Sequence, residues 1–146
     1  MTQQDIQLLR ESFTRIAPIA DHAAALFYER IFSIAPELRP LFTNDMQTQG
    51  AKLMAMLGTI VSLVHSPDKL VPLLQNLGKR HSEYGVKTEH FRSVGEALLW
   101  TLEQGLGAEY TPAIHQAWLS ALTTISTVMK DAMTNTETDY KANITV

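Results

Sequence analysis

The sequence predicts an all-α protein that forms one domain. Apolar residues recur every three or four positions over long stretches, which is the period of a helix with one buried face. The seven glycines and six prolines fall in clusters between these stretches. No alternating apolar run is flanked by Asn-Gly or Asp-Gly, so strands are not expected. The 146 residues suit a single domain over 1–146, with its core at about 3–133 and a polar tail at 134–146.

Caps and prolines set the expected helix boundaries. The first helix is expected to begin after Thr2, a candidate N-cap, and to end near Ala17, because Pro18 removes a backbone donor. The second is expected from Asp21, another candidate N-cap, to about Ile34. The remaining helical segments are expected at about 36–42 as a short turn, 47–64, 69–82, 89–106 and 112–133, with a loop over about 43–48.

Composition excludes several classes of protein. A formal net charge of −3 argues against a nucleic-acid binder that neutralises many phosphates. The absence of cysteine rules out disulfides, thiolate metal sites and a cysteine nucleophile. The polar N-terminus and the lack of any apolar run near ~20 residues predict neither a secretory signal nor a membrane span, so a cytoplasmic protein is expected. Phosphate-binding loops and the GxSxG and HExxH motifs are also missing.

One of the five histidines stands out. Leu70, Leu74, Leu77 and His81 follow one another at helical spacing, so His81 is expected on a buried helix face. A buried imidazole needs a hydrogen-bond partner or a metal, and a neutral imidazole is a good ligand for iron. His81 is therefore either a satisfied core histidine or an iron ligand. The histidines expected on the surface are His22, His65, His90 and His115.

Two polar side chains are predicted to face His81. Gln49 lies 32 positions before it, and helices joined by the Ser66-Pro67-Asp68 turn can place the two side chains on opposite walls of a cavity. Tyr28 can enter from the second helix. The hydroxyl and the amide can donate hydrogen bonds to a molecule bound at the iron. The alternatives are a core tyrosine bonded to backbone and an exposed glutamine.

These residues lie in segments that resemble a known family. The segments are Ala25-Leu26-Phe27-Tyr28, Pro36-Glu37-Leu38-Arg39-Pro40-Leu41-Phe42, Gln49-Gly50-Ala51-Lys52-Leu53, Leu77-Gly78-Lys79-Arg80-His81 and Val94-Gly95-Glu96-Ala97-Leu98-Leu99. They resemble the globins, in particular a bacterial single-domain globin similar to the haem domain of flavohaemoglobins. The resemblance covers about residues 3–133 and implies a globin fold, a three-over-three helical sandwich around haem b (iron protoporphyrin IX).

The resemblance also implies roles for individual residues. His81 would be the proximal iron ligand, Phe42 would pack against the haem face, and Tyr28, Gln49 and Leu53 would be the distal residues. The other pocket residues that it implies are Leu57, Leu77, Val86, Phe91, Val94 and Leu98, with Lys52 and Arg80 as candidates to meet the haem propionates. No second histidine is expected to reach the iron, and no residue is assigned a catalytic role.

Two positions depart from the flavohaemoglobin pattern. Those proteins have a tyrosine and a glutamate that hydrogen-bond near the proximal histidine, whereas this chain has Phe91 and Met133. Neither side chain can take up that bond, so the His81 N–H is expected to bond to a backbone carbonyl. Activation of an O–O bond would then be weak. No flavin- or nicotinamide-binding half is present in this sequence, so any turnover is expected to need an external reductase.

The sequence therefore favours a haem protein that binds O2, CO and NO reversibly at a pentacoordinate iron. Hydrogen bonds from Tyr28 and Gln49 are expected to give high oxygen affinity, suited to oxygen storage, delivery or scavenging. One alternative is a nitric-oxide dioxygenase that uses a separate reductase, so enzymatic activity stays open. Another is a non-haem or sensory module that acts through partners. A monomer or a homodimer is expected, without a nucleic-acid partner.

Overall fold

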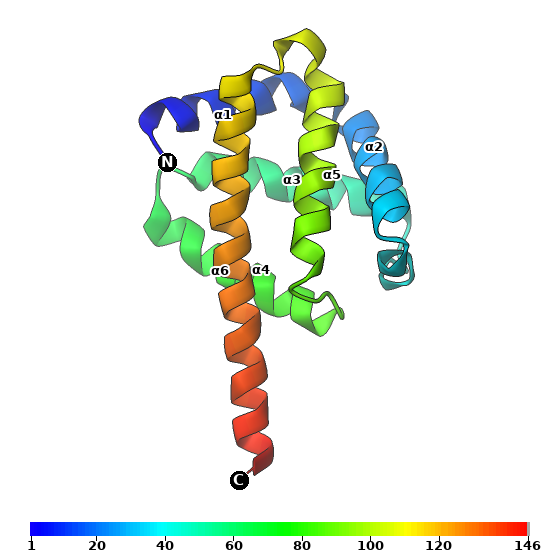
Figure 1. The fold of residues 1–146 in the computed structure, drawn as a ribbon, viewed down its shortest axis with the longest axis vertical. Coiled ribbons are helices and arrows are strands. Elements are labelled where there is room, and N and C mark those ends of the chain that lie inside the picture. The colour runs from blue at the N-terminus through cyan, green and yellow to red at the C-terminus, as the bar shows by residue number, and fades with distance from the viewer. Residues whose placement is uncertain (146) are drawn as a thin grey trace.

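Every regular element that the computed structural model describes, over the backbone of residues 1–145 and the side chains of residues 1–133, is a helix (Figure 1). The elements are α1 (Gln3–Ile16), η1 (Ala17–Ile19), α2 (Ala20–Ile34), η2 (Pro36–Leu41), α3 (Met46–Leu63), α4 (Pro67–Glu83), α5 (His90–Leu106), η3 (Gly107–Glu109) and α6 (Pro112–Thr145). The all-α prediction is thereby confirmed. Within the described part of the chain, no helix is both long and apolar enough to cross a membrane.

Side-chain caps explain where two of the helices begin. Thr2 and Asp5 form a capping box, in which the Thr2 hydroxyl accepts the Asp5 N–H and the Asp5 carboxylate accepts the Thr2 N–H, each at 3.1 Å. The predicted cap at Thr2 is confirmed. Asp45 caps α3 by accepting the Thr48 N–H at 3.0 Å. Because of this cap, α3 begins at Met46 and the preceding loop ends earlier than expected.

Two predicted boundaries are wrong. Asp21 does not cap the second helix, since α2 begins one residue earlier at Ala20, directly after η1, and Asp21 lies in its first turn. The last helix does not end near Met133 but continues to Thr145, and its C-terminal part projects beyond the other helices (Figure 1). No glycine or proline follows Pro112. The polar tail therefore lacks the residues that usually stop a helix.

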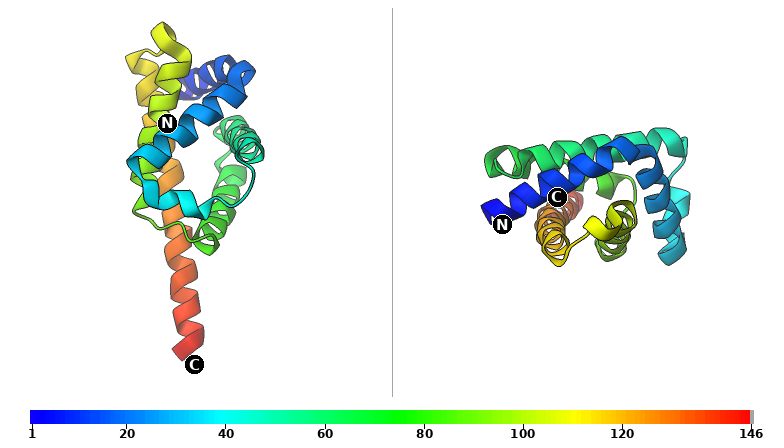
Figure 2. Two further views of the ribbon diagram at one scale, coloured as in Figure 1. Left: turned by 90° about the vertical axis from the view of Figure 1, so that its right-hand side faces the viewer. Right: turned by 90° about the horizontal axis from the view of Figure 1, so that it is seen from above.

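The helices cross one another around three apolar clusters. α5 and α6 run side by side, and α1 and α3 cross them on one side of the molecule (Figures 1 and 2). The most extensive contacts join α4 to α6 and α2 to α5. The first cluster surrounds Trp118 and joins α1, α2, α3, α5 and α6. The second surrounds Tyr28 and joins α2, η2 and α5, and the third surrounds Leu74 and joins α3, α4 and α6.

The crossing of α2 and α3 depends on Gly50. A Cβ atom at this position would lie 2.8 Å from the Cβ of Ala24, which is closer than two carbon atoms can pack. Small residues on both helices therefore let the first turn of α3 lie against α2. This contact places Gln49, the neighbour of Gly50, beside the α2 helix that carries Tyr28.

The substitution Ser12→Ala is expected to destabilise the protein by about 1–3 kcal/mol. The Trp118 indole N–H donates to the Ser12 hydroxyl at 2.8 Å between α6 and α1, and both side chains are buried. Without the hydroxyl, the indole N–H has no partner and cannot reach water. Urea unfolding followed by circular dichroism measures the loss. Ser62→Ala, which removes an exposed hydroxyl, is the matched control, and equal stability of the two variants would contradict the expectation.

Candidate functional site

His81 lies near the C-terminal end of α4, on the face that this helix buries. Leu70 and Leu74 on that face are 7% and 0% exposed, and Leu77 packs against the third cluster. The Nδ1 atom of His81 lies 2.7 Å from the carbonyl oxygen of Leu77, one helical turn earlier. Because a carbonyl can only accept, Nδ1 carries the hydrogen and donates it. The predicted bond to a backbone carbonyl is confirmed, and it leaves the lone pair on Nε2.

The surroundings of His81 favour its neutral form. Burial lowers the pKa of His81 below its ordinary value, and the bond to the Leu77 carbonyl offsets only part of this effect. The imidazole is therefore uncharged at neutral pH. A neutral imidazole with its hydrogen on Nδ1 is the form that ligates a metal through Nε2. The same bond is also compatible with the alternative, a core histidine without a metal, because it gives Nδ1 a partner in both cases.

Tyr28 is buried on α2 within an aromatic group. Its ring centroid lies 5.0 Å from that of Phe27 and 5.4 Å from that of Phe42, both in edge-to-face contact. Phe32 stacks on the same ring at a centroid distance of 5.9 Å, and this contact was not predicted from the sequence. Tyr28 and Phe32 are four positions apart, which is one helical turn, and this spacing could have predicted the contact.

The Tyr28 hydroxyl interacts with the side chain of Gln49. Burial raises the pKa of Tyr28, and the hydrogen bond with Gln49 lowers it by a smaller amount. The hydroxyl therefore stays protonated and keeps a hydrogen to donate. Gln49 itself is half-buried in the first turn of α3. The structure thus brings together the two polar side chains that the sequence singled out, from two different helices.

The predicted apolar residues lie against neighbouring clusters. Those packed against the second cluster are Phe42, Leu53, Val94 and Leu98. Those packed against the third cluster, together with Leu77, include Phe91. Leu57 lines an apolar cavity of about 20 Å³ with Leu53 and Leu98, and Val86 lies in the turn between α4 and α5. Tyr28 and Phe42 therefore belong to the second cluster, and Leu70 and Leu74 on the α4 face that carries His81 belong to the third.

The two residues expected near propionates lie at the surface. Lys52 on α3 and Arg80 on α4 are both exposed. Within residues 1–133, neither is paired with a carboxylate. They are available to an anionic group, and their assignment remains a prediction.

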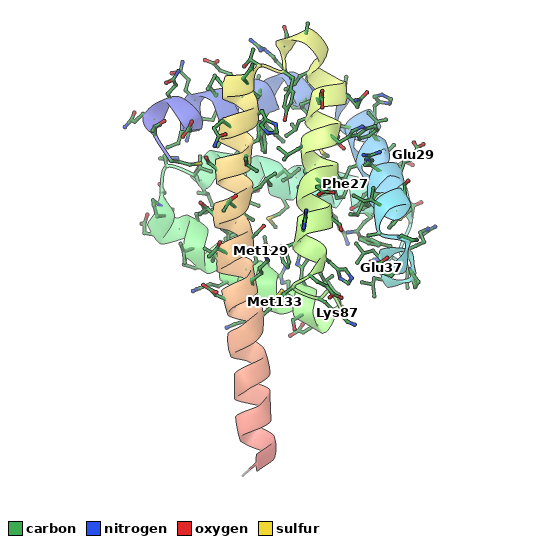
Figure 3. All side chains as sticks on the ribbon, in the orientation of Figure 1. Phe27, Glu29, Glu37, Lys87, Met129 and Met133 are labelled. Carbon is green, nitrogen blue, oxygen red and sulfur yellow. The ribbon has the colours of Figure 1, made fainter. Side chains whose placement is uncertain are left out.

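The two positions that depart from the flavohaemoglobin pattern add no polar group to His81. Phe91 is half-buried, and the Lys130 ammonium lies 5.9 Å from the centre of its ring. Met133 on α6 is 1% exposed, and Met129 lies one turn before it (Figure 3). Both side chains are apolar and cannot accept the His81 N–H, which is donated to the Leu77 carbonyl instead.

One of the expected surface histidines is buried. His90, the first residue of α5, is 7% exposed, so that prediction is wrong for this residue. Its Nδ1 accepts the Lys87 N–H at 3.1 Å. His22 and His65 are exposed as expected, whereas His115 is half-buried and bonds to the Tyr110 hydroxyl at 2.6 Å.

The donor set around His81 fits a haem. A haem brings four nitrogen ligands of its own and needs an axial side chain, which His81 can supply through Nε2. Its macrocycle needs apolar surroundings, and most of the apolar residues predicted for the pocket pack against the second and third clusters. Among residues 1–133, no group of three or more His, Cys, Asp or Glu side chains is arranged to hold a metal ion.

Comparison with known proteins gives one family. The family model described as Globin matches residues 25–129. Neuroglobin-2 of Oncorhynchus mykiss is 32% identical over 143 residues, covering 88% of this chain and 90% of that protein. Neuroglobin of Tetraodon nigroviridis is 32% identical over 134 residues, covering 82% of this chain and 84% of that protein.

A solved structure has the same fold. It is an engineered carbene transferase, described as a putative nitric oxide dioxygenase from Rhodothermus marinus. Its TM-score is 0.86 at 23% identity, and the match covers 97% of this chain and 99% of that one. The expected globin fold is confirmed by the family match and this likeness.

Acid is expected to destabilise the cofactor-free chain through His81. Because burial lowers the pKa of His81 in the folded state, the unfolded chain binds this proton first as the pH falls. The free energy of unfolding should therefore fall as the pH drops through the ordinary value of 6.5, until the folded state is protonated too. Urea titrations at about pH 7.5 and pH 5.5 measure the change. His81→Leu should reduce it, and an unchanged pH dependence in that variant would refute the expectation.

Proposed function

Because the chain belongs to the globin family, we propose that it carries haem b on His81 and binds dioxygen reversibly and with high affinity. Family membership supports a haem cofactor and the binding of diatomic gases. The haem type, the axial residue and the affinity are the proposal. The observation that carries it is the 2.7 Å bond from His81 Nδ1 to the Leu77 carbonyl, which leaves Nε2 with the lone pair that a metal requires.

The chain's residues suit both sides of such a haem. Bound here, the haem would supply an iron with one protein ligand and one open position for a gas molecule. His81 would hold the iron, and Phe42 and Leu53 would keep water away from it. Lys52 and Arg80 are exposed and can meet the two propionates. Exclusion of water favours reversible binding because it slows oxidation of the iron.

Tyr28 and Gln49 supply the hydrogen bonds that would retain the gas. The buried hydroxyl stays protonated, and its side chain already interacts with the amide of Gln49. A hydrogen bond to an acceptor that carries partial charge contributes about 1.5–3 kcal/mol. Since about 1.4 kcal/mol is a factor of ten, even one such bond slows the release of dioxygen markedly.

The proximal side supports binding rather than cleavage of an O–O bond. His81 donates its N–H to a neutral carbonyl, and the residues at the two departing positions, Phe91 and Met133, cannot accept it. An imidazole bonded to a carboxylate would be more electron-donating. The weaker partner keeps His81 close to an ordinary neutral imidazole, which suits oxygen storage, delivery or scavenging.

A second candidate function is nitric-oxide dioxygenation with a separate reductase. It is favoured by the likeness of the fold to a protein described as a putative nitric oxide dioxygenase, and by the paired Tyr28 and Gln49 donors. Consumption of many equivalents of nitric oxide in the presence of an added flavin reductase and NADH would favour this function. A single stoichiometric reaction would favour the oxygen-binding function.

The absorption spectrum tests the proposal directly. After reduction with dithionite without oxygen, the purified protein is expected to show an intense haem band in the near ultraviolet and one broad visible band. This is the pattern of a five-coordinate iron with an open position. Two sharp visible bands would mean that a side chain occupies that position. If no haem band forms even after haemin is added, the proposed function is wrong.

Tyr28→Phe is expected to speed dioxygen release by roughly ten-fold to a hundred-fold, because it removes one hydrogen-bond donor and little volume. Stopped-flow replacement of dioxygen by carbon monoxide measures the rate. Tyr110→Phe is the matched control, since that hydroxyl bonds to His115 near the start of α6 and not to Gln49. Equal rates in the two variants would show that Tyr28 does not contact the gas.

A further inference from the structure

The turn between α4 and α5 contacts two segments that carry residues of the proposed haem site. The Val86 N–H donates to the carbonyl oxygen of His81 at 3.0 Å, so the position of the turn affects the residue expected to hold the iron. Gly85 has a φ of +93°, and a Cβ there would lie 3.4 Å from the Leu41 side chain of η2. The turn therefore packs on the segment that leads into Phe42.

His90 closes this turn through two reciprocal hydrogen bonds. The His90 N–H donates to the Lys87 carbonyl at 3.0 Å, and the Lys87 N–H donates to His90 Nδ1 at 3.1 Å. An imidazole nitrogen that accepts carries no hydrogen, so the ring hydrogen of His90 lies on Nε2.

The other ring nitrogen of His90 faces η2. Its Nε2 lies 4.0 Å from the carboxylate of Glu37, which is itself largely exposed (Figure 3 labels Glu37 and Lys87). The carboxylate of Glu37 in η2 lies next to the His90 ring, and the backbone N–H of Lys87 contacts the ring on its Nδ1 side. The Nε2–H tautomer suits both neighbours, since one requires an acceptor and the other attracts a donor.

We propose that His90 is a positioning residue, which holds the 84–89 turn against η2 and thereby helps to retain the haem on His81. The part that concerns haem rests on the proposed function. One buried ring accepts a hydrogen bond from the turn that bonds to His81 and lies 4.0 Å from Glu37, in the segment that precedes Phe42. Opening of the turn would loosen both contacts together.

Two substitutions separate the role of each ring nitrogen. His90→Asn puts an amide oxygen near the place of Nδ1 and can still accept the Lys87 N–H. His90→Gln puts its amide near the place of Nε2 and lacks that acceptor. Hydrogen exchange of the Lys87 amide in the full chain as purified is expected to be about ten-fold faster in His90→Gln than in the unsubstituted protein, and nearly normal in His90→Asn. The rate of haem transfer to excess apomyoglobin should likewise be higher in His90→Gln than in the unsubstituted protein, and nearly normal in His90→Asn.

His22→Gln, an exposed histidine of α2, is the control. Equal exchange of the Lys87 amide in His90→Gln and this control would overturn the proposal. Faster exchange with unchanged haem transfer would overturn the retention of haem. Should His90→Gln fail to fold, nitrogen NMR of the unsubstituted protein decides, since hydrogen on Nδ1 instead of Nε2 would refute the bond. A chain that takes up no haem at all contradicts the proposed function, while amide exchange still tests the closure of the turn.

Discussion

The bond between His81 Nδ1 and the Leu77 carbonyl is the interaction on which the candidate site depends. It is made within one helix, between residues one turn apart, so both of its atoms come from α4. It fixes the tautomer and holds the ring at one orientation relative to the helix. Burial of the same ring keeps it neutral. Local backbone geometry and apolar packing therefore give a neutral imidazole with its lone pair on Nε2, the form that can ligate a metal.

The proposed distal residues, Tyr28 and Gln49, are also uncharged. Tyr28 is surrounded by the rings of Phe27, Phe32 and Phe42, so ionisation of its hydroxyl is unfavourable. The hydroxyl and the Gln49 amide offer hydrogen bonds but no net charge. A charged group at this place would cost more to bury than a neutral one. Neutral donors in apolar surroundings suit a small neutral ligand such as dioxygen.

The sequence could predict features that depend on neighbours within one helix. The apolar period located the helices, Thr2 was predicted as a cap, and the spacing of Leu77 and His81 placed the histidine on a buried face. The Tyr28–Gln49 contact joins two helices, and the sequence could place these side chains near one another only as one arrangement among alternatives. Its physical cause, the close approach at Gly50 and Ala24, is a packing distance that no periodicity contains.

The features that the sequence missed depend on how segments join. Asp21 has the composition of a cap, but a cap requires a non-helical backbone, and the chain passes from η1 into α2 without one at that position. From the sequence, His90 is expected to be an exposed polar residue at the start of a helix. In the structure it is 7% exposed, because the turn before it packs on η2 and the ring lies beside Glu37 of that segment. Polar residues at junctions are thus ambiguous from sequence alone. Their role is decided by whether another segment lies over the junction, and here η2 does so beside the turn that bonds to His81.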